Sequence, residues 1–230
     1  FSLSSFWTHI ANYKCSWFSA VPTQYAYILN HTESPANLSH LRFARSASAP
    51  LSPDIHRRFE ERFNIPIIET MGLTETGSQI TTNPMPPAIR KPGSPGKAFG
   101  NEIMIGDENL SAVPVGTTGE ILVRGANVMR GYLNQPEETA KTISPEGWLR
   151  TGDLGYLDED GYVFVSGRIK ELIIKGGENI APREIDEALL EHDAVLEAAA
   201  FAVPCENYGE RVEACIRLKD HAQTGLEELL

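Results

Sequence analysis

Short hydrophobic runs alternate with amphipathic stretches in the first third of the chain. Runs of this length, bounded by turn residues, are typical of buried strands, and the stretches between them have the spacing of helices. Pro22 ends the first run, and Ser52 and Pro53 provide a cap and a first-turn proline for a helix. The pattern predicts strands at 16–21, 41–44 and 65–68, and helices through residues 25–29 and 53–63. Strands that alternate with helices indicate a parallel α/β layer.

The pattern changes after Thr76. Residues 83–97 are rich in proline and glycine, which indicates a long rigid loop. Beyond this loop, short runs typical of strands alternate with turns at 102–105, 120–124, 155–157 and 162–166. Such a series predicts a small antiparallel barrel or sheet. Asp158–Gly161 lies between the last two runs, and because the later ligand positions of a calcium loop are missing, we expect a hairpin turn there.

A third part begins near residue 168. Residues 181–190 form an amphipathic helical pattern that places Ile185, Leu189 and Leu190 on one face, and strands are predicted at 195–203 and 211–218. We therefore predict an α/β protein in three parts: a parallel α/β layer over 1–95, an antiparallel β-barrel over 96–167, and a small α+β domain over 168–230. The chain starts with Phe, and residues 225–230 resemble the first turns of a helix. We expect both ends to be breaks in a longer protein.

Composition narrows the function classes. The 230 residues carry a formal net charge of −11, which argues against a general nucleic-acid binder. Cys15, Cys205 and Cys215 form no CxxC pair, and the histidines lack metal-ligand spacing, so neither a disulfide framework nor a zinc site is predicted. No run is long enough to span a membrane and no signal peptide is recognised, so the expected location is cytoplasmic.

Candidate chemistry first appears in Ile68–Gly77, directly after a predicted strand. Open α/β sheets bind ligands in loops of this kind. Thr74 can donate to a phosphate oxygen, and Glu75 can hold a magnesium ion. Taken alone, the segment favours a plain polar turn. A second segment, Gly119–Leu133, combines a strand, a glycine turn and an aromatic anchor, and we assign it a structural role.

Two further segments carry polar groups suited to a nucleotide. In Trp148–Asp153, the carboxylate of Asp153 follows a turn glycine and can accept hydrogen bonds from ribose hydroxyls, although an exposed turn aspartate is the plainer interpretation. In Ser166–Ile180, Arg168 can bind ribose or phosphate with its planar fork. Gly176 and Gly177 permit close approach of the backbone to a thin ligand.

In this order and spacing, the segments resemble the adenylate-forming superfamily of acyl-CoA synthetases, luciferases and peptide-synthetase adenylation domains. The resemblance covers Ser16 to Lys219 and is most specific from Glu69 to Glu187. It implies that 1–95 and 96–167 belong to a large AMP-binding domain, followed by the start of a small C-terminal domain. The implied nucleotide-binding residues are Ser48, Ala49 and Pro50 of the Ser46–Pro50 turn, Met71, Gly72, Asp153 and Arg168.

The same resemblance implies catalytic roles. Thr74 matches the phosphate-contacting threonine, Glu75 the magnesium ligand, and Lys170 the hinge about which the small domain rotates. The loop of Gly176, Gly177 and Glu178 matches the one that approaches the pantetheine arm of coenzyme A. The implied cofactors and co-substrates are ATP or AMP, Mg²⁺ and coenzyme A, and the implied activity is that of an acid–CoA ligase.

The chain departs from the family pattern at several places. Met71 stands where the family usually has a tyrosine that stacks on adenine. The phosphate loop is expected upstream of residue 1, and the lysine that aligns the carboxylate is expected beyond Leu230. Gly116–Gly119 resembles the phosphate loop only superficially and is predicted to be a turn. A fragment that lacks both groups is expected to be inactive alone.

Three functions remain open at this stage. The first is an acid–CoA ligase; the stretches 77–84 and 91–94 resemble the oxalate–CoA ligase branch, although Gln79 stands where that branch tends to have histidine. The second is an adenylation domain that loads an acid onto a carrier protein. Residues 167–171 favour the first, because carrier-loading relatives more often have Asp at the hinge. The third is a non-catalytic fragment or binding module. The sequence indicates neither the oligomeric state nor which carboxylic acid is the substrate.

Overall fold

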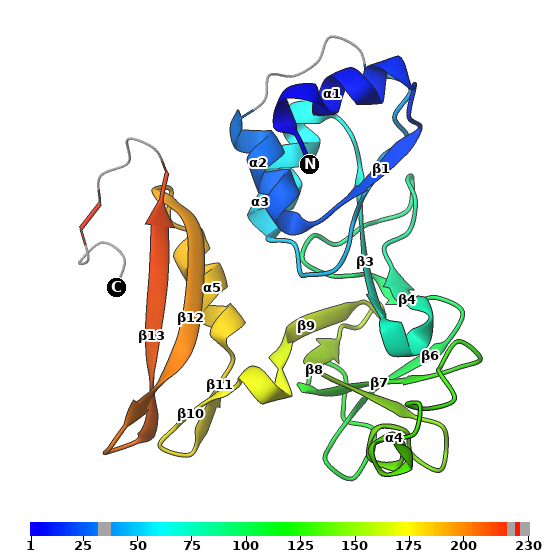
Figure 1. The fold of residues 1–230 in the computed structure, drawn as a ribbon, viewed down its shortest axis with the longest axis vertical. Helices are drawn as coiled ribbons and strands as arrows, with labels where there is room; N and C mark the ends of the chain where they lie inside the picture. The colour runs from blue at the N-terminus through cyan, green and yellow to red at the C-terminus, as the bar shows by residue number, and fades with distance from the viewer. Residues whose placement is uncertain (32–37, 220–223, 226–230) are drawn as a thin grey trace. The chain divides into compact units, whose positions relative to one another are not determined.

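The computed structural model describes residues 1–31, 38–219 and 224–225, arranged in two compact units (Figure 1). The first unit contains residues 1–151 and 156–165, and the second contains residues 152–155 and 166–230. The finer division at residues 95 and 167 stays a prediction. Within the described part, no helix is long and apolar enough to cross a membrane. The helix expected at 225–230 lies almost wholly outside the described residues.

The first sheet of the first unit has five strands in the order β1-β2-β3-β4-β5. Its strands β1–β3 are parallel, as the alternation of strands and helices predicts. One prediction was wrong in extent: the strand expected to end at residue 68 continues to Leu73, because the antiparallel β4 pairs with it. The strands are β1 (Trp17–Ala20), β2 (Phe43–Ser46), β3 (Ile67–Leu73), β4 (Ser78–Thr82) and β5 (Lys97–Ala98).

Aromatic side chains dominate the core between the parallel strands and their helices. Tyr25 and Phe59 are fully buried, with ring centroids 5.0 Å apart in an edge-to-face arrangement. Figure 1 shows the helices gathered beside the parallel strands. They are α1 (Leu3–Asn12), which was not predicted, α2 (Pro22–His31) and α3 (Pro53–Phe63). Pro53 lies in the first turn of α3, and Asn64 ends the helix in the left-handed conformation.

The second sheet of the chain has the strand order β6-β7-β8-β9, so the predicted antiparallel part exists as a four-stranded sheet. Its strands are β6 (Glu102–Gly106), β7 (Gly119–Arg124), β8 (Leu149–Leu157) and β9 (Val163–Arg168). The strand predicted at 155–157 was too short: β8 begins at Leu149, so Asp153 lies within a strand and not after a turn. The short helix α4 (Pro136–Thr142) was not predicted, because it has no buried residue and hence no apolar periodicity.

The turn between β8 and β9 is the predicted hairpin turn. Asp158 accepts hydrogen bonds from the backbone amides of Asp160 and Tyr162, at 3.0 and 2.8 Å. The ammonium of Lys91 lies 2.5 Å from the Asp158 carboxylate and 2.6 Å from that of Asp160. A lysine from the proline-rich loop therefore supplies the positive charge that these carboxylates need.

The second unit contains α5 (Pro182–Leu190) and a sheet of order β11-β10-β13-β12. The predicted helix and the two long strands are confirmed. The hairpin of β10 (Ile173–Lys175) and β11 (Glu178–Ile180) was expected only as a glycine loop. The long strands β12 (Val195–Cys205) and β13 (Gly209–Leu218) pair antiparallel along their length.

Candidate functional site

The predicted phosphate and magnesium residues lie in a single tight turn at the carboxyl end of β3. Thr74–Thr76 forms a 3-10 helix, in which Thr74 is exposed, Glu75 is half-buried and Thr76 is buried. The turn is closed locally: the backbone amide of Leu73 donates to the Thr76 hydroxyl at 3.2 Å, and that hydroxyl reaches the Leu73 carbonyl at 3.0 Å. The turn therefore presents Thr74 and Glu75 and buries Thr76 as its internal support.

Gly72 has a packing reason of its own. The pairing of β3 with β4 shifts register between Met71 and Gly72. A Cβ atom on Gly72 would lie 1.7 Å from the carbonyl oxygen of Ser78, so only glycine allows the two strands to approach. This close contact helps to position the end of β3, and Thr74 and Glu75 follow directly after it. Sequence reasoning assigned this glycine to nucleotide binding alone.

Met71 does not lie free in a pocket. Its side chain is half-buried and packs against the hydrophobic cluster of Ile105, Ile121 and Val163 in the first unit. Its backbone amide donates to the hydroxyl of Thr81 at 3.2 Å. Met71 thus joins the parallel sheet to the neighbouring antiparallel strands. Its expected contact with adenine stays a prediction.

The predicted adenine loop follows β2. Ser48, Ala49 and Pro50 are all exposed, and Ser48 has a positive φ of 78°. Because β2 and β3 are neighbouring parallel strands, with Ser46 paired to Glu69, their carboxyl ends face the same side of the sheet, and β3 continues four residues beyond that pair, to Leu73. Ligands bind open α/β sheets on this side. The fold of the first unit thus brings the 48–50 loop and the Thr74–Glu75 turn to the same side of the sheet.

The turn is also held by a segment that sequence reasoning considered only architectural. The hydroxyl of Tyr132 donates to Oε1 of Glu75 at 2.9 Å, and the amide of Met129 donates to the Glu75 carbonyl at 2.7 Å. The side-chain amide of Asn127 donates to the Thr76 carbonyl at 3.2 Å. The sequence pattern carries no signal for these contacts, because partners so distant along the chain meet only in the fold.

The side chains near Glu75 can be compared with the ligands that Mg²⁺ requires. No cluster of three or more His, Cys, Asp or Glu side chains suited to a metal occurs among the described residues. Mg²⁺ is normally held by one or two carboxylates together with substrate phosphates and water, not by a cage made only of protein groups. A single carboxylate, Glu75, beside the exposed hydroxyl of Thr74 fits that mode, in which the nucleotide brings the other oxygen ligands.

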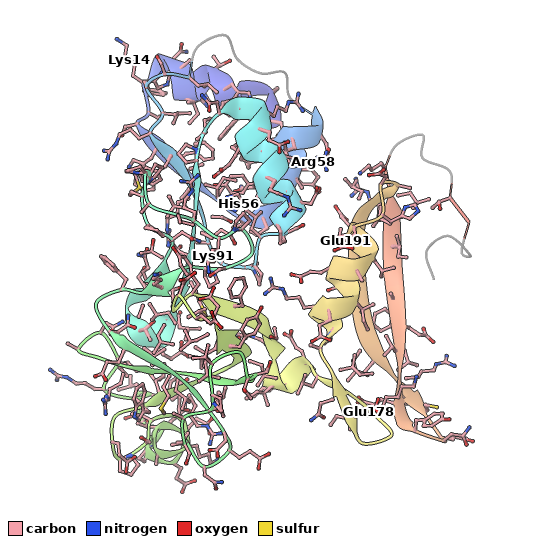
Figure 2. All side chains as sticks on the ribbon, turned by 180° about the vertical axis from the view of Figure 1, so that it is seen from behind. Lys14, His56, Arg58, Lys91, Glu178 and Glu191 are labelled. Atoms are coloured by element: carbon pink, nitrogen blue, oxygen red, sulfur yellow. The ribbon has the colours of Figure 1, made fainter. Side chains whose placement is uncertain are left out.

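A buried ionic network anchors β3 from the helix side. Nδ1 of His56 lies 2.6 Å from Glu69 and its Nε2 lies 3.0 Å from Glu60, while Arg90 also pairs with Glu60 at 3.0 Å. Glu69 accepts a further hydrogen bond from the amide of Gly93 at 3.0 Å. The network therefore joins α3, β3 and the proline-rich loop, two residues before Met71. Figure 2 labels His56 on α3.

The network shifts the protonation of its members. Burial would lower the pKa of His56, but hydrogen bonds to Glu60 and Glu69 outweigh it and raise the pKa. Burial would likewise raise the pKa of Glu60, but the hydrogen bonds from His56 and from the Ile67 amide lower it to about 2. A protonated His56 between two carboxylates is the arrangement that both shifts favour.

In the second unit, Asp153 and Arg168 form an ion pair. Nε of Arg168 donates to Oδ1 of Asp153 at 2.7 Å; the aspartate side chain is 7% exposed and that of the arginine 53%. A buried carboxylate needs a compensating charge, and Arg168 supplies it. A carboxylate accepts hydrogen bonds from hydroxyl groups, and an exposed guanidinium can contact an anion, so both groups are of the types that the predicted nucleotide contacts need.

The remaining predicted residues of the second unit are exposed. Lys170 lies in the 3-10 helix Ile169–Glu171, directly after Arg168. Gly176 and Gly177 form the turn between β10 and β11, with φ values of 61° and 91°, and Glu178 begins β11. Figure 2 labels Glu178 at this hairpin. A Cβ atom on Gly177 would meet nothing within 4 Å, so this backbone is open to solvent.

The chain matches two family models, that of the AMP-binding enzyme over residues 1–133 and that of the AMP-binding enzyme C-terminal domain over residues 184–230. It is 50% identical over 225 residues to a sulfoacetate–CoA ligase of Cupriavidus necator, across 97% of this chain and 44% of that relative. It is 42% identical over 226 residues to an oxalate–CoA ligase of Saccharomyces cerevisiae, across 98% of this chain and 41% of that relative.

Solved structures agree with this relationship. ATP-bound MatB from Rhodopseudomonas palustris superposes with a TM-score of 0.91 at 34% identity, across 98% of this chain and 44% of that one. The chain spans less than half the length of the curated relatives that it matches. Because the AMP-binding model alone covers more than half of the 230 residues, the chain belongs to the AMP-binding enzyme family.

Proposed function

We propose that the protein containing this chain is an ATP-dependent acid–CoA ligase. The observation that carries the proposal is the turn at the end of β3, which presents Thr74 and Glu75 on the carboxyl-end side of a parallel sheet, the side that also carries the exposed 48–50 loop. The sulfoacetate–CoA and oxalate–CoA ligases among the relatives support this activity.

The reaction proceeds in two steps. An oxygen of the acid carboxylate attacks the α-phosphorus of ATP, forms the acyl-adenylate and releases pyrophosphate. The thiolate of coenzyme A then attacks the adenylate carbonyl carbon, the bond to the phosphate oxygen breaks, and AMP leaves. Neither step requires a redox partner. Charge neutralisation and alignment are the main sources of rate in such a reaction.

In the first unit, the 48–50 loop, Met71 and Gly72 line the adenine and Thr74 donates to a phosphate oxygen. When bound, Mg²⁺ neutralises phosphate charge, and Glu75 is the residue of this chain that would hold it.

In the second unit, Asp153 accepts from the ribose hydroxyls and Arg168 contacts the nucleotide. Lys170 marks the hinge, and the 176–178 hairpin approaches the pantetheine arm. Each of these roles is proposed from the family resemblance together with the exposed or charge-paired positions of the residues.

The acid is proposed to be short and anionic. Both curated relatives described above are named for such acids. The stretches 77–84 and 91–94, which resemble the oxalate–CoA ligase branch, support the same substrate class. A cytoplasmic location remains a prediction of the sequence.

Carboxylate-dependent exchange between ATP and pyrophosphate tests the proposal. This chain is assayed beside a version extended at both ends to the length of its relatives, with oxalate, sulfoacetate, an aromatic acid and a long-chain acid. We expect exchange by the extended protein with a short anionic acid and none by the chain alone. Loss of exchange in the Glu75→Gln variant is expected as well.

The acceptor is tested separately. Thioester formed with free coenzyme A supports the ligase, whereas transfer only to a carrier protein supports the adenylation-domain alternative. An extended protein that neither exchanges pyrophosphate nor binds ATP contradicts the enzyme assignment.

A further inference from the structure

The segment between β7 and α4 donates hydrogen bonds to the Thr74–Thr76 turn, although it belongs to neither of the strands that flank this turn. Residues Asn127, Met129 and Tyr132 each donate one hydrogen bond to Glu75 or Thr76, at 3.2, 2.7 and 2.9 Å respectively. Their acceptors are the backbone carbonyl oxygens of Glu75 and Thr76 and the side-chain carboxylate of Glu75. The two halves of this contact are far apart in the chain and belong to the same compact unit.

The bond from Tyr132 differs from the other two in its target. It occupies Oε1 of Glu75, the side-chain oxygen, whereas Asn127 and Met129 bind carbonyl oxygens. A carboxylate has several lone-pair sites, so one donated hydrogen bond fixes its rotamer and leaves further sites open for a ligand. Removal of the phenol hydroxyl would free the carboxylate without releasing the backbone of the turn.

Tyr132 is itself held in place from the other side. Its backbone amide donates to the hydroxyl of Thr139 in α4 at 2.9 Å. The preceding Gly131 has a φ of 146°, and a Cβ atom there would lie 2.6 Å from Thr139, so the chain packs tightly against this helix. The backbone of Tyr132 is thus anchored to α4 by contacts that do not involve Glu75. Such an independently anchored donor can orient a carboxylate before any ligand binds.

The chemistry of the two groups fixes the direction of the bond between Tyr132 and Glu75. A tyrosine hydroxyl has one proton to donate, and an ionised carboxylate can only accept. Tyr132 is therefore the donor and Glu75 the acceptor of the 2.9 Å contact.

We propose that Tyr132 is a positioning residue that orients the Glu75 carboxylate toward the metal of a bound magnesium–nucleotide complex. The inference rests on the proposed function, because it requires that Glu75 meets the metal. Hydrogen-bond donors behind a metal-binding carboxylate fix its orientation, and their removal typically lowers metal affinity about 10- to 100-fold. The segment Gly119–Leu133 would then contribute to the chemistry, not to architecture alone.

Calorimetric titration of the extended protein with ATP, in the presence and absence of Mg²⁺, tests the inference. Tyr132→Phe removes the hydroxyl and keeps the ring. We expect its affinity for ATP with Mg²⁺ to fall about tenfold, with little change for ATP alone. The matched control is Tyr13→Phe, because Tyr13 is 77% exposed on the first unit and lies outside the site. It should leave both affinities unchanged.

A double variant separates positioning from a general structural effect. In Glu75→Gln, the group that Tyr132 orients is no longer an anionic ligand, so adding Tyr132→Phe should cause little further loss of Mg²⁺-dependent affinity. A structural role would instead weaken binding of ATP with and without the metal, and by the same factor in both backgrounds. Thermal unfolding of each variant shows whether the fold is retained.

The outcomes distinguish the two proposals. If the unaltered extended protein shows no Mg²⁺-dependent ATP binding, the proposed function and this inference both fail. If it binds, and Tyr132→Phe binds with the same Mg²⁺ dependence, the positioning role is overturned and the ligase proposal stands. A loss that is equal with and without Mg²⁺, or that persists in the Glu75→Gln background, also overturns the positioning role.

Discussion

Gly72 and Gly177 belong to two predicted ligand-binding motifs, yet the structure requires them for opposite reasons. A Cβ atom on Gly72 would lie 1.7 Å from the Ser78 carbonyl oxygen, whereas one on Gly177 would meet nothing within 4 Å. Gly177 is instead required by its backbone, which has a φ of 91°. The first glycine allows two strands to pack, and the second allows an exposed hairpin to turn. A glycine therefore reflects the close packing of two strands in the first unit and a left-handed backbone in the second.

The surroundings of the two glycines differ in the same way. Gly72 lies in a unit with a large buried core, and the residues that follow it are positioned by strand pairing and by the Glu75–Tyr132 contact. In the described part of the second unit, the buried hydrophobic residues are Ile173, Ala181 and Val195. We infer that the first site is rigid by packing, while the 176–178 hairpin is held mainly by backbone hydrogen bonds, including one from the Gly176 amide to the Tyr208 carbonyl at 2.9 Å.

The largest effect is expected from Gly72→Ala. The added methyl group cannot fit beside the Ser78 carbonyl, and neither backbone can move without breaking the pairing of β3 and β4. The clash is with main-chain atoms and not with a flexible side chain, so the two strands must separate, and we expect a cost of about 4 kcal/mol or more. Chemical denaturation followed by tryptophan fluorescence should show the first unit largely unfolded or strongly destabilised.

A second glycine of the first unit serves as the control for Gly72→Ala. Gly116 has a positive φ of 79° but open space around its Cβ position. Gly116→Ala should therefore cost only the backbone strain of a left-handed residue, about 1 kcal/mol. Equal losses for the two variants would contradict the packing explanation.

A smaller but pH-dependent effect is expected from His56→Ala. The change leaves the carboxylates of Glu60 and Glu69 facing a buried gap without the imidazolium, and breaking a buried pair costs about 3 kcal/mol. The pKa of His56 is raised above its ordinary value of 6.5. Its contribution is therefore complete below about pH 6.5 and is lost as the pH rises through the folded-state pKa. The variant should lose this alkaline decline in the free energy of unfolding.

Glu60 determines how the free energy of unfolding changes at acid pH. Its pKa falls from an ordinary 4.5 to about 2, so its contribution is present above pH 4.5 and is lost as the pH falls toward 2. Arg58→Ala is the matched control on α3, because its pair with Asp54 is exposed and is worth less than about 0.5 kcal/mol. A pH profile identical in the unaltered chain and in His56→Ala would show that the network is not ionised as described.

The sequence predicted the elements whose signals are local. The strands β1–β3, the helices α2, α3 and α5, and the long strands β12 and β13 follow from hydrophobic spacing and proline positions, whereas α1 was not predicted. Thr74 and Glu75 were placed correctly after β3, but the strand was predicted to stop at residue 68. Its extension to Leu73 depends on β4, whose polar sequence Ser78–Thr82 has no strand pattern of its own.

The contacts that position the site could not be predicted because they are long-range. Tyr132 lies 57 residues from Glu75, and His56 lies 13 residues from Glu69 on a different element. Each of these side chains is ordinary in its local sequence. They acquire a role only when the sheet brings their elements together, which one sequence without aligned relatives does not reveal.

The smallest effect on stability, and the most informative for function, is expected from Gly177→Ala. An alanine at a φ of 91° is strained by about 1 kcal/mol but meets no neighbour, so unfolding should change little. The added methyl group lies on the open side of the hairpin that we propose approaches coenzyme A. In the extended protein, thioester formation should therefore slow while ATP–pyrophosphate exchange stays normal. Gly116→Ala, with the same strain far from this hairpin in the sequence, should leave both reactions unchanged. Equal slowing of both reactions by Gly177→Ala would mean that the hairpin acts before the acyl-adenylate forms. This result would contradict the assignment of separate roles to a packed first site and an open second one.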